Sequence, residues 1–303
     1  MAQYQKGQRN ATFQPFSLGA HPLCVLLIAA FLLFGILPTA HAAPPGQDAA
    51  TAGELLLPVL TPVSSGGISL HTHTVDVALA PGDGLSLAVS LRASYRLRND
   101  GSAASAVTVQ IPAFAAQSVA LTADGAPLAA TAGADGAATV TVPVGADQAV
   151  ELALSYDTVI QDRRLPQIRY PSGDLDQWLG QVSMRMDIRP PATMPPASWL
   201  SVSPADWAYA PPGVSPDPAL EWLYDGGPPD AVVFQTLHPS VWQQIQTAEQ
   251  AAAPGAAPSA FAQLGELYAG LSTAAASEGS AEASERFYSQ AVAAYTSGIR
   301  QGE

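Results

Sequence analysis

The chain has 303 residues, of which 48% are hydrophobic and 12% are charged, and its formal net charge is −13. A chain of this length can bury a sizeable core and is compatible with about two domains. The acidic balance, without any basic stripe, argues against nucleic acid as a partner and against docking on an anionic lipid surface.

The N-terminal segment predicts export. Residues 22–38 form an apolar run that follows two basic residues and precedes the small-x-small sequence Ala40-His41-Ala42. This order is typical of a signal peptide, here residues 1–42, cleaved before Ala43. The alternative is an uncleaved anchor over residues 22–38, which would be the chain's contact with a membrane, although the run is short against the ~20 residues of a spanning helix. Both alternatives place the rest of the chain in the periplasm, at the cell surface or outside the cell.

The exported part would contain no cysteine. Cys24 and the only lysine, Lys6, precede the cleavage point, and all the acidic residues follow it. Ten arginines then face 25 Asp and Glu residues, which gives a formal net charge of −15. A chain without cysteine has no disulfide, no thiolate nucleophile and no thiolate metal ligand.

The most regular stretch is Leu85–Leu97, in which apolar side chains occupy every second position. A period of two buries one face of a strand, and such a strand needs partner strands and a facing apolar layer. The apolar phase of the preceding Ile68–Ala80 changes between Leu70 and Val75, which predicts a β-bulge. Residues 43–67 are rich in Ala, Pro, Gly and Ser, and we expect a flexible lead-in there with at most one short strand.

Further short strands separated by Asp-Gly turns predict a β-sandwich. Their spacing is typical of an antiparallel sandwich with immunoglobulin-like architecture, which we place at residues 68–236. The expected strands are Val107–Ile111, Ser118–Thr122, Ala138–Val144, Ala149–Val159 and Gly180–Arg189.

Residues 190–229 carry eleven prolines, so this segment cannot form a continuous sheet. It also contains Trp199, Trp207, Trp222 and Tyr224, whereas disordered linkers are poor in aromatic residues. We therefore expect the segment to pack on the sandwich. If these four side chains instead lie side by side on an exposed face, they could stack on sugar rings.

Residues 239–300 predict a helical tail. Apolar residues recur there at helical spacing, and Pro254-Gly255 and Ser277-Glu278-Gly279-Ser280 separate the periodic segments. The expected helices are Val241–Ala253, Ser259–Ala275 and Ala281–Ile299. The face of the last helix that we expect to be buried comprises Phe287, Tyr288, Ala291, Val292, Tyr295 and Ile299.

The last two helices resemble one tetratricopeptide repeat. The matching residues are Phe261, Leu264, Gly265 and Tyr268 in the first helix and Tyr288 and Ala291 in the second. The resemblance implies a hairpin that needs a further layer, because one repeat cannot bury its faces alone. Either the helix at Val241–Ala253 or a partner would supply that layer. The alternative is a plain helical hairpin packed on its own domain.

The order of the whole chain is also similar to that of exported bacterial proteins of unassigned function, in which a β-sandwich leads to a repeat-like tail. This resemblance implies no activity. The residues that carry it are Tyr95, Leu97, Asn99, Asp124-Gly125, Leu154-Ser155-Tyr156, Trp222, Tyr224, Pro239 and Trp242.

His71 and His73 are the main candidates for metal ligands. Residues i and i+2 of a strand share a face, so both imidazoles could bind one ion, with Asp76 or His238 completing the ligand set. The alternative is two half-exposed histidines beside a bend. Asp174-Leu175-Asp176 could offer oxygens to Ca²⁺ but lacks the other ligands of a calcium loop. No serine-hydrolase elbow, P-loop or nucleotide-binding glycine motif is present, so we predict neither catalysis nor a cofactor.

The sequence therefore favours a non-enzymatic, exported interaction module of the cell envelope or the medium, with another envelope protein as its partner. The alternative is a module that binds carbohydrate or another envelope polymer through Trp and Tyr side chains, and a hydrolase with an unassigned site is the third hypothesis. Candidate partner-binding residues are Trp199, Trp207, Trp222, Tyr224, Tyr268, Tyr288 and Tyr295.

Overall fold

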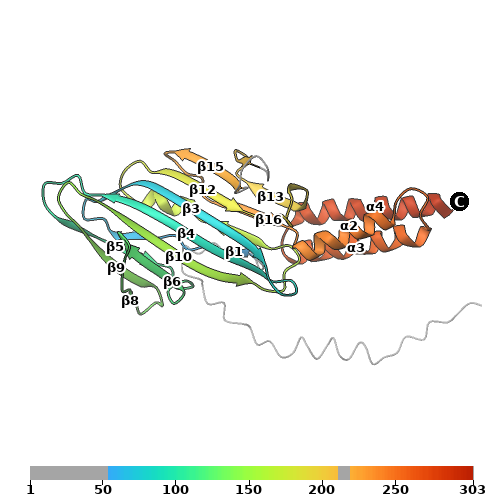
Figure 1. Ribbon diagram of the computed structural model, residues 1–303, viewed down its shortest axis with the longest axis horizontal. Helices are drawn as coiled ribbons and strands as arrows, with labels where there is room; N and C mark the ends of the chain where they lie inside the picture. The colour runs from blue at the N-terminus through green and yellow to red at the C-terminus, as the bar shows by residue number, and fades with distance from the viewer. Residues whose placement is uncertain (1–53, 211–218, 303) are drawn as a thin grey trace, which may run out of the picture. The chain divides into compact units, whose positions relative to one another are not determined.

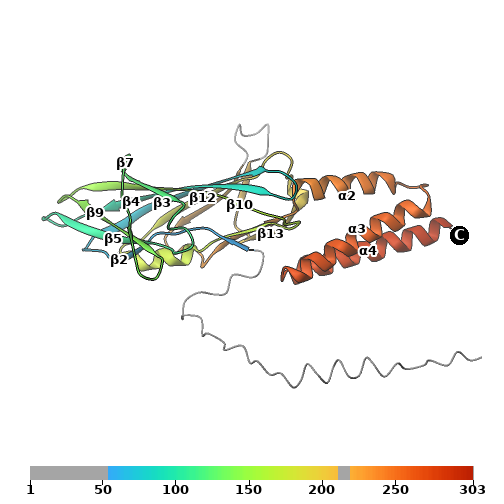
Figure 2. The ribbon, with the colours of Figure 1, turned by 90° about the horizontal axis from the view of Figure 1, so that it is seen from below.

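The computed structural model describes residues 54–210 and 219–302, so the predicted signal peptide or anchor at residues 1–42 lies outside the described residues. The chain is β-rich, with open sheets followed by C-terminal helices (Figures 1 and 2). The predicted order of a β-rich part and a helical tail is confirmed. None of the helices in the two described ranges is long and apolar enough to cross a membrane.

The largest sheet has eight strands and is organised around β4 (Leu87–Arg98), which pairs along its whole length with β3 (Ser69–Pro81) and β10 (Ala149–Ile160). Every second side chain of β4 from Leu87 to Leu97 is buried, as the alternation in the sequence predicts. The other strands of this sheet are β6 (Val119–Ala123), β7 (Ala126–Pro127), β12 (Ser183–Arg189), β14 (Ala208–Ala210) and β15 (Ala219–Asp225).

Two features of β3 bear on the predictions. The register of its pairing with β4 shifts between Leu70 and Thr72, which confirms the predicted bulge. Its other neighbour, β12, runs parallel to it, so the expected purely antiparallel arrangement is wrong at this pair. Eight other strands lie between β3 and β12 in the chain, and nothing local in the sequence reveals the direction in which β12 returns. An immunoglobulin-like strand arrangement is not confirmed.

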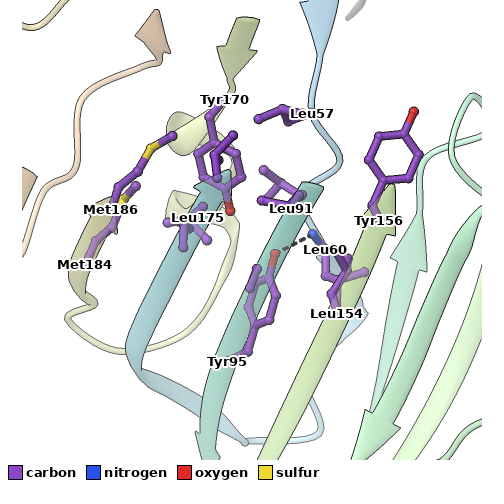
Figure 3. Packing of buried hydrophobic residues seen from close by; sticks show 14 of the residues in the cluster. Leu57, Leu60, Leu91, Tyr95, Leu154, Tyr156, Tyr170, Leu175, Met184 and Met186 are labelled. Atoms are coloured by element: carbon purple, nitrogen blue, oxygen red, sulfur yellow. Dashed lines mark hydrogen bonds between the residues drawn. The ribbon is translucent and has the colours of Figure 1, made fainter. Parts of the chain in front are cut away.

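Two four-stranded sheets contribute to the same buried core as the large sheet. Figure 2 shows β2, β5 and β9 across from β3, β4 and β10, and Figure 3 shows the aromatic and aliphatic side chains between the layers. The first small sheet comprises β2 (Thr61–Ser64), β5 (Ser105–Ile111), β9 (Ala138–Val144) and β8 (Thr131–Ala132). The second comprises β1 (Glu54–Leu56), β11 (Gln167–Tyr170), β16 (Val232–Thr236) and β13 (Trp199–Ser203).

The structure corrects the expected lead-in at residues 43–67. From residue 54 onward this segment supplies β1 and β2, and β1 runs parallel to β11. Leu57, Val59 and Leu60 are buried in the core, because the apolar patch of this segment is its main hydrophobic feature. Residues 43–53 lie outside the described residues.

The three predicted helices are present as α2 (Pro239–Ala251), α3 (Pro258–Ser277) and α4 (Ala281–Gly302). Helix α3 lies between α2 and α4 (Figure 2). A second buried cluster joins Val241 and Ile245 of α2 to Tyr268 and Leu271 of α3. This cluster also includes Leu237, which directly follows β16, so the helices pack against the β-rich part as well as against one another.

Candidate interaction surface

The structure separates the seven predicted partner-binding residues into buried and exposed groups. Trp199, Trp222 and Tyr268 are buried, and Trp207 and Tyr224 are half-buried. Tyr288 and Tyr295 are exposed, and both belong to α4. Of the seven, only these two therefore present a large aromatic surface to solvent.

Two tryptophans of the proline-rich segment, Trp199 and Trp222, are buried in the core, and Trp207 is half-buried against it. The Trp199 ring makes edge-to-face contacts with Tyr209 at 5.0 Å and Phe234 at 5.7 Å between centroids. Its indole N–H donates to the Met194 carbonyl at 3.1 Å, and the Trp222 indole donates to the Pro204 carbonyl at 3.0 Å. This agrees with the expected packing on the sheets and leaves no exposed row of indole faces of the kind that stacking on sugar rings requires.

Helix α4 carries an exposed apolar row, which we call the α4 stripe: Tyr288, Val292, Tyr295 and Ile299, exposed by 64%, 48%, 39% and 66%. The prediction that these four side chains are buried is wrong. The prediction is confirmed for Phe287 and Ala291, which form the buried face of α4 together with Ala283, Ala294 and Gly298.

The close approach of α3 and α4 explains this correction. A Cβ at Gly298 would lie 3.0 Å from the Cβ of Phe261, and one at Gly265 would lie 2.7 Å from the Tyr295 ring. Small residues at a contact let two helices approach so closely that larger side chains no longer fit between them. Phe287 is the one large apolar side chain of α4 that is buried in this contact. The other large apolar side chains of α4 lie beside the contact, and Tyr295 covers Gly265 at its edge.

The exposed apolar residues are concentrated on this helix. Nine large hydrophobic side chains are exposed in the described parts of the chain, and four of them form the α4 stripe. The other five are scattered over separate strands and loops: Val63, Phe114, Val159, Leu179 and Leu223. Single exposed apolar residues are ordinary, whereas a contiguous row indicates an interaction site.

The charges on α4 are divided between its two halves. Glu282 and Glu285 lie in the first half, and Arg300 lies near the C-terminal end. Arg286 is also in the first half, but its guanidinium is directed toward the β-rich part, with Nη1 3.5 Å from the Trp199 carbonyl. The outward surface of α4 is thus acidic at one end, apolar in the middle and basic at the other end.

The structure does not bring the predicted metal ligands together. The bulge in β3 leaves His71 exposed, with Nε2 3.9 Å from an Asp100 oxygen, and turns His73 into the core. His238 caps α2, and its Nε2 lies 3.1 Å from the Ser86 carbonyl. In the described parts of the chain, no group of three His, Cys, Asp or Glu side chains is arranged to hold a metal ion.

The two Asp residues of the predicted calcium segment also have different surroundings. Asp174 is half-buried in a 3₁₀ turn (Ser172–Gln177), where burial raises the pKa of its carboxyl group. Asp176 is exposed.

Sequence reasoning missed a buried polar network around His73. Its Nδ1 lies 2.9 Å from the Ser94 carbonyl and its Nε2 lies 2.5 Å from the Tyr170 hydroxyl. Because a carbonyl only accepts, Nδ1 carries the proton and Nε2 accepts from Tyr170. Burial lowers the pKa of His73 to about 4. The Tyr95 hydroxyl accepts from the Leu60 N–H at 3.0 Å (Figure 3). All these groups are buried, so the network holds the layers together rather than forming an open site.

Comparisons with known proteins place this chain by fold alone. No family model matches the sequence, and no curated protein matches it. A Legionella pneumophila structure described as a proposed nutrient binding protein is 12% identical, with a TM-score of 0.50 over 82% of this chain and 98% of that one. At this identity the likeness shows a shared fold alone.

Two enzymes show weaker likeness. Yeast LTA4 hydrolase is 10% identical, with a TM-score of 0.33 over 61% of this chain. An M1 zinc metallopeptidase mutant from Deinococcus radiodurans is 10% identical, with a TM-score of 0.31 over 56% of this chain. The matched parts cover 35% and 42% of those enzymes, so most of each lies outside the likeness.

Proposed function

We propose that this protein is an exported, non-enzymatic protein–protein interaction module of the cell envelope or the medium, and that the α4 stripe is its contact surface. The observation that carries the proposal is the exposed apolar row along one helix, flanked by charged residues. Central apolar residues with a polar rim are the usual anatomy of a protein interface.

Burial of the α4 stripe alone would contribute a limited free energy of binding. Full burial of a large apolar side chain contributes about 1.5–3 kcal/mol, and these four are already partly covered. Burying the remainder would contribute roughly 4 kcal/mol, which only matches the lower range of the cost of association. A stable partner must therefore bury apolar side chains of its own against the stripe or cover neighbouring surface on α3 or α4.

We also propose that the three helices have a tetratricopeptide-like arrangement. In this arrangement α3 and α4 form one hairpin, and α2 supplies the layer on one side of it. The packing of Val241 and Ile245 against α3 supports this arrangement. The open side of α4 would then be the position of the next layer, which a partner would fill. The exposure of Tyr288, however, departs from the expected burial of the matching repeat position.

A position-specific crosslink tests the proposed surface. A photoreactive residue at Ile299 of the exported chain, produced in its own cells, is expected to form a protein adduct on illumination. The matched control is Ala293, which is exposed on the same helix but lies outside the stripe. Absence of an adduct at position 299, or equal adducts at both positions, would contradict the proposal.

Export is tested by the intact mass and the cell fraction of the chain expressed with its own N-terminus. We expect a soluble exported protein that begins at Ala43, because residues 22–38 are short for a spanning helix and a cleavage sequence follows them. Full-length protein in the membrane fraction would instead identify residues 22–38 as an anchor. Recovery in the cytoplasm would contradict both alternatives.

The alternative hypothesis of a carbohydrate-binding module has little support from the positions of the Trp and Tyr side chains. It needs Trp and Tyr side chains side by side on an exposed face, whereas Trp199 and Trp222 are buried and their indole donors are satisfied by backbone carbonyls. The distant likeness to peptidases is too weak to support the hydrolase hypothesis. Neither alternative is favoured by a specific observation in the described residues.

A further inference from the structure

The spacing of the α4 stripe fits a helix as its occupant. Successive residues of the stripe, from Tyr288 to Ile299, are separated by four, three and four positions. This is the spacing of core positions in two helices that pack side by side in a coiled coil. The stripe extends for about 16 Å along the helix, which corresponds to three turns. A partner helix of similar length would therefore cover all four side chains.

The charges on α4 favour the α4 helix of a second copy of this chain as the occupant of the stripe, running antiparallel to the first. With a two-fold axis level with Ala293 and Ala294, Arg300 of each copy comes within two residues of Glu285 of the other. Arg286 of the other copy is one residue closer in level, but its guanidinium is directed toward the Trp199 carbonyl of its own chain. A parallel arrangement would instead place the two Arg300 side chains level with each other. Opposite charges at matched positions stabilise one register and orientation over others.

The apolar residues are also complementary in the antiparallel arrangement. Tyr288 of one copy lies level with Ile299 of the second, and Val292 lies level with Tyr295. Each ring therefore meets an aliphatic side chain, and every layer contains one large and one smaller residue. Ser289 and Thr296, which are exposed beside the stripe, are small enough to let the helices approach.

We infer that two copies of this chain associate through their α4 helices, antiparallel about a two-fold axis. The inference rests on the proposed function, because it names the partner of the same surface. Each copy would cover the stripe of the other, and the charged ends of the helices would fix the register.

Sedimentation equilibrium of the exported chain over a concentration series tests this inference. We expect the wild type to approach the mass of two chains and Val292→Glu to remain at the mass of one, because a carboxylate in the seam would be buried without a partner. Ala293→Glu is the matched control, since the adjacent residue lies about 130° around the helix from the stripe. It should behave like the wild type. Equal folding of the three proteins is checked by urea unfolding.

A charge swap tests the orientation. Arg300→Glu is expected to weaken association about tenfold, because it replaces two exposed ion pairs with two repulsions. Adding Glu285→Arg to the same chain should restore the wild-type dissociation constant. A double variant no tighter than the single one would overturn the antiparallel register.

The outcomes separate this inference from the proposed function. A wild-type chain that keeps the mass of one copy at every concentration would overturn the inference, as would dimers that persist in Val292→Glu. If such a monomer still forms a specific adduct with another protein from position 299, the proposed function stands without the dimer. If it forms none, both fail.

Discussion

Lowering the pH from 6.5 to 4 is expected to reduce the free energy of unfolding by about 3 kcal/mol through His73 alone. In the unfolded chain the imidazole takes up a proton near its ordinary pKa of 6.5, whereas in the folded chain burial lowers its pKa to about 4. Between these values the unfolded state binds more protons, so stability falls as the pH falls. The pH dependence due to His73 ends about one unit above 6.5, and the loss is complete about one unit below 4.

The groups around His73 decide how the experiment is done. The pKa values of the Tyr95 and Tyr170 hydroxyls are raised by burial, so neither titrates in this range. The pKa of the Asp174 carboxyl, which influences both tyrosines, is also raised by burial. Asp174 has the opposite effect on the free energy of unfolding. Because its pKa is higher in the folded state, the folded state takes up this proton at a higher pH, and stability rises as the pH falls. The contribution of His73 must therefore be measured as a difference between variants.

Urea unfolding of the wild type and of His73→Gln, followed by tryptophan fluorescence at several pH values, measures that difference. The variant should be less stable at neutral pH, because it disturbs a buried hydrogen-bonded network. The gap should narrow by about 3 kcal/mol as the pH falls to 4. His71→Gln is the control, since it removes an exposed histidine from the same strand and leaves the network intact. If the free energies of unfolding of the wild type and His73→Gln differed by the same amount at every pH, the pKa of His73 would be the same in the folded and unfolded states.

The sequence allows a good prediction of the regular elements, because each has a local signal. The alternation in Leu85–Leu97 predicts β4, the change of phase after Leu70 predicts the bulge, and the apolar periodicity beyond residue 239 predicts three helices. The partners of these elements carry no such signal. Tyr170 lies 97 positions from His73, and the parallel pairing of β3 with β12 joins residues that are 111 positions apart in the chain, such as Thr72 and Ser183.

The candidate surface could be predicted only in part. The sequence shows that α4 has a broad apolar side, but it does not show which half of that side another helix covers. That depends on how closely α3 approaches, which is set by residues such as Gly265 and Gly298 on facing helices. Large apolar side chains are the usual candidates for a core, whereas apart from Phe287 the buried face of α4 consists of alanine and glycine. Glycine and alanine spaced along one face were the signal that could have indicated this.

Replacing Gly298 with leucine is expected to destabilise the protein by about 1–3 kcal/mol through overpacking between α3 and α4. A Cβ at this position would already lie 3.0 Å from the Cβ of Phe261 and 3.3 Å from the carbonyl oxygen of Pro258. Neither atom is at the end of a flexible side chain, so the helices themselves must move apart. Urea unfolding with an unchanged slope would measure the loss directly.

Gly270→Ala provides the matched comparison on α3, because the nearest atom to a Cβ there is the Arg164 Nη1 at 3.9 Å. This substitution should stabilise the protein by about 0.5–1 kcal/mol, since alanine favours a helix over glycine. Opposite signs at the two glycines would establish that close approach, rather than helix propensity, requires Gly298. If Gly298→Leu were as stable as the wild type, the α3–α4 contact would be loose enough to admit larger side chains. The exposure of the α4 stripe would then no longer follow from the close packing of these two helices.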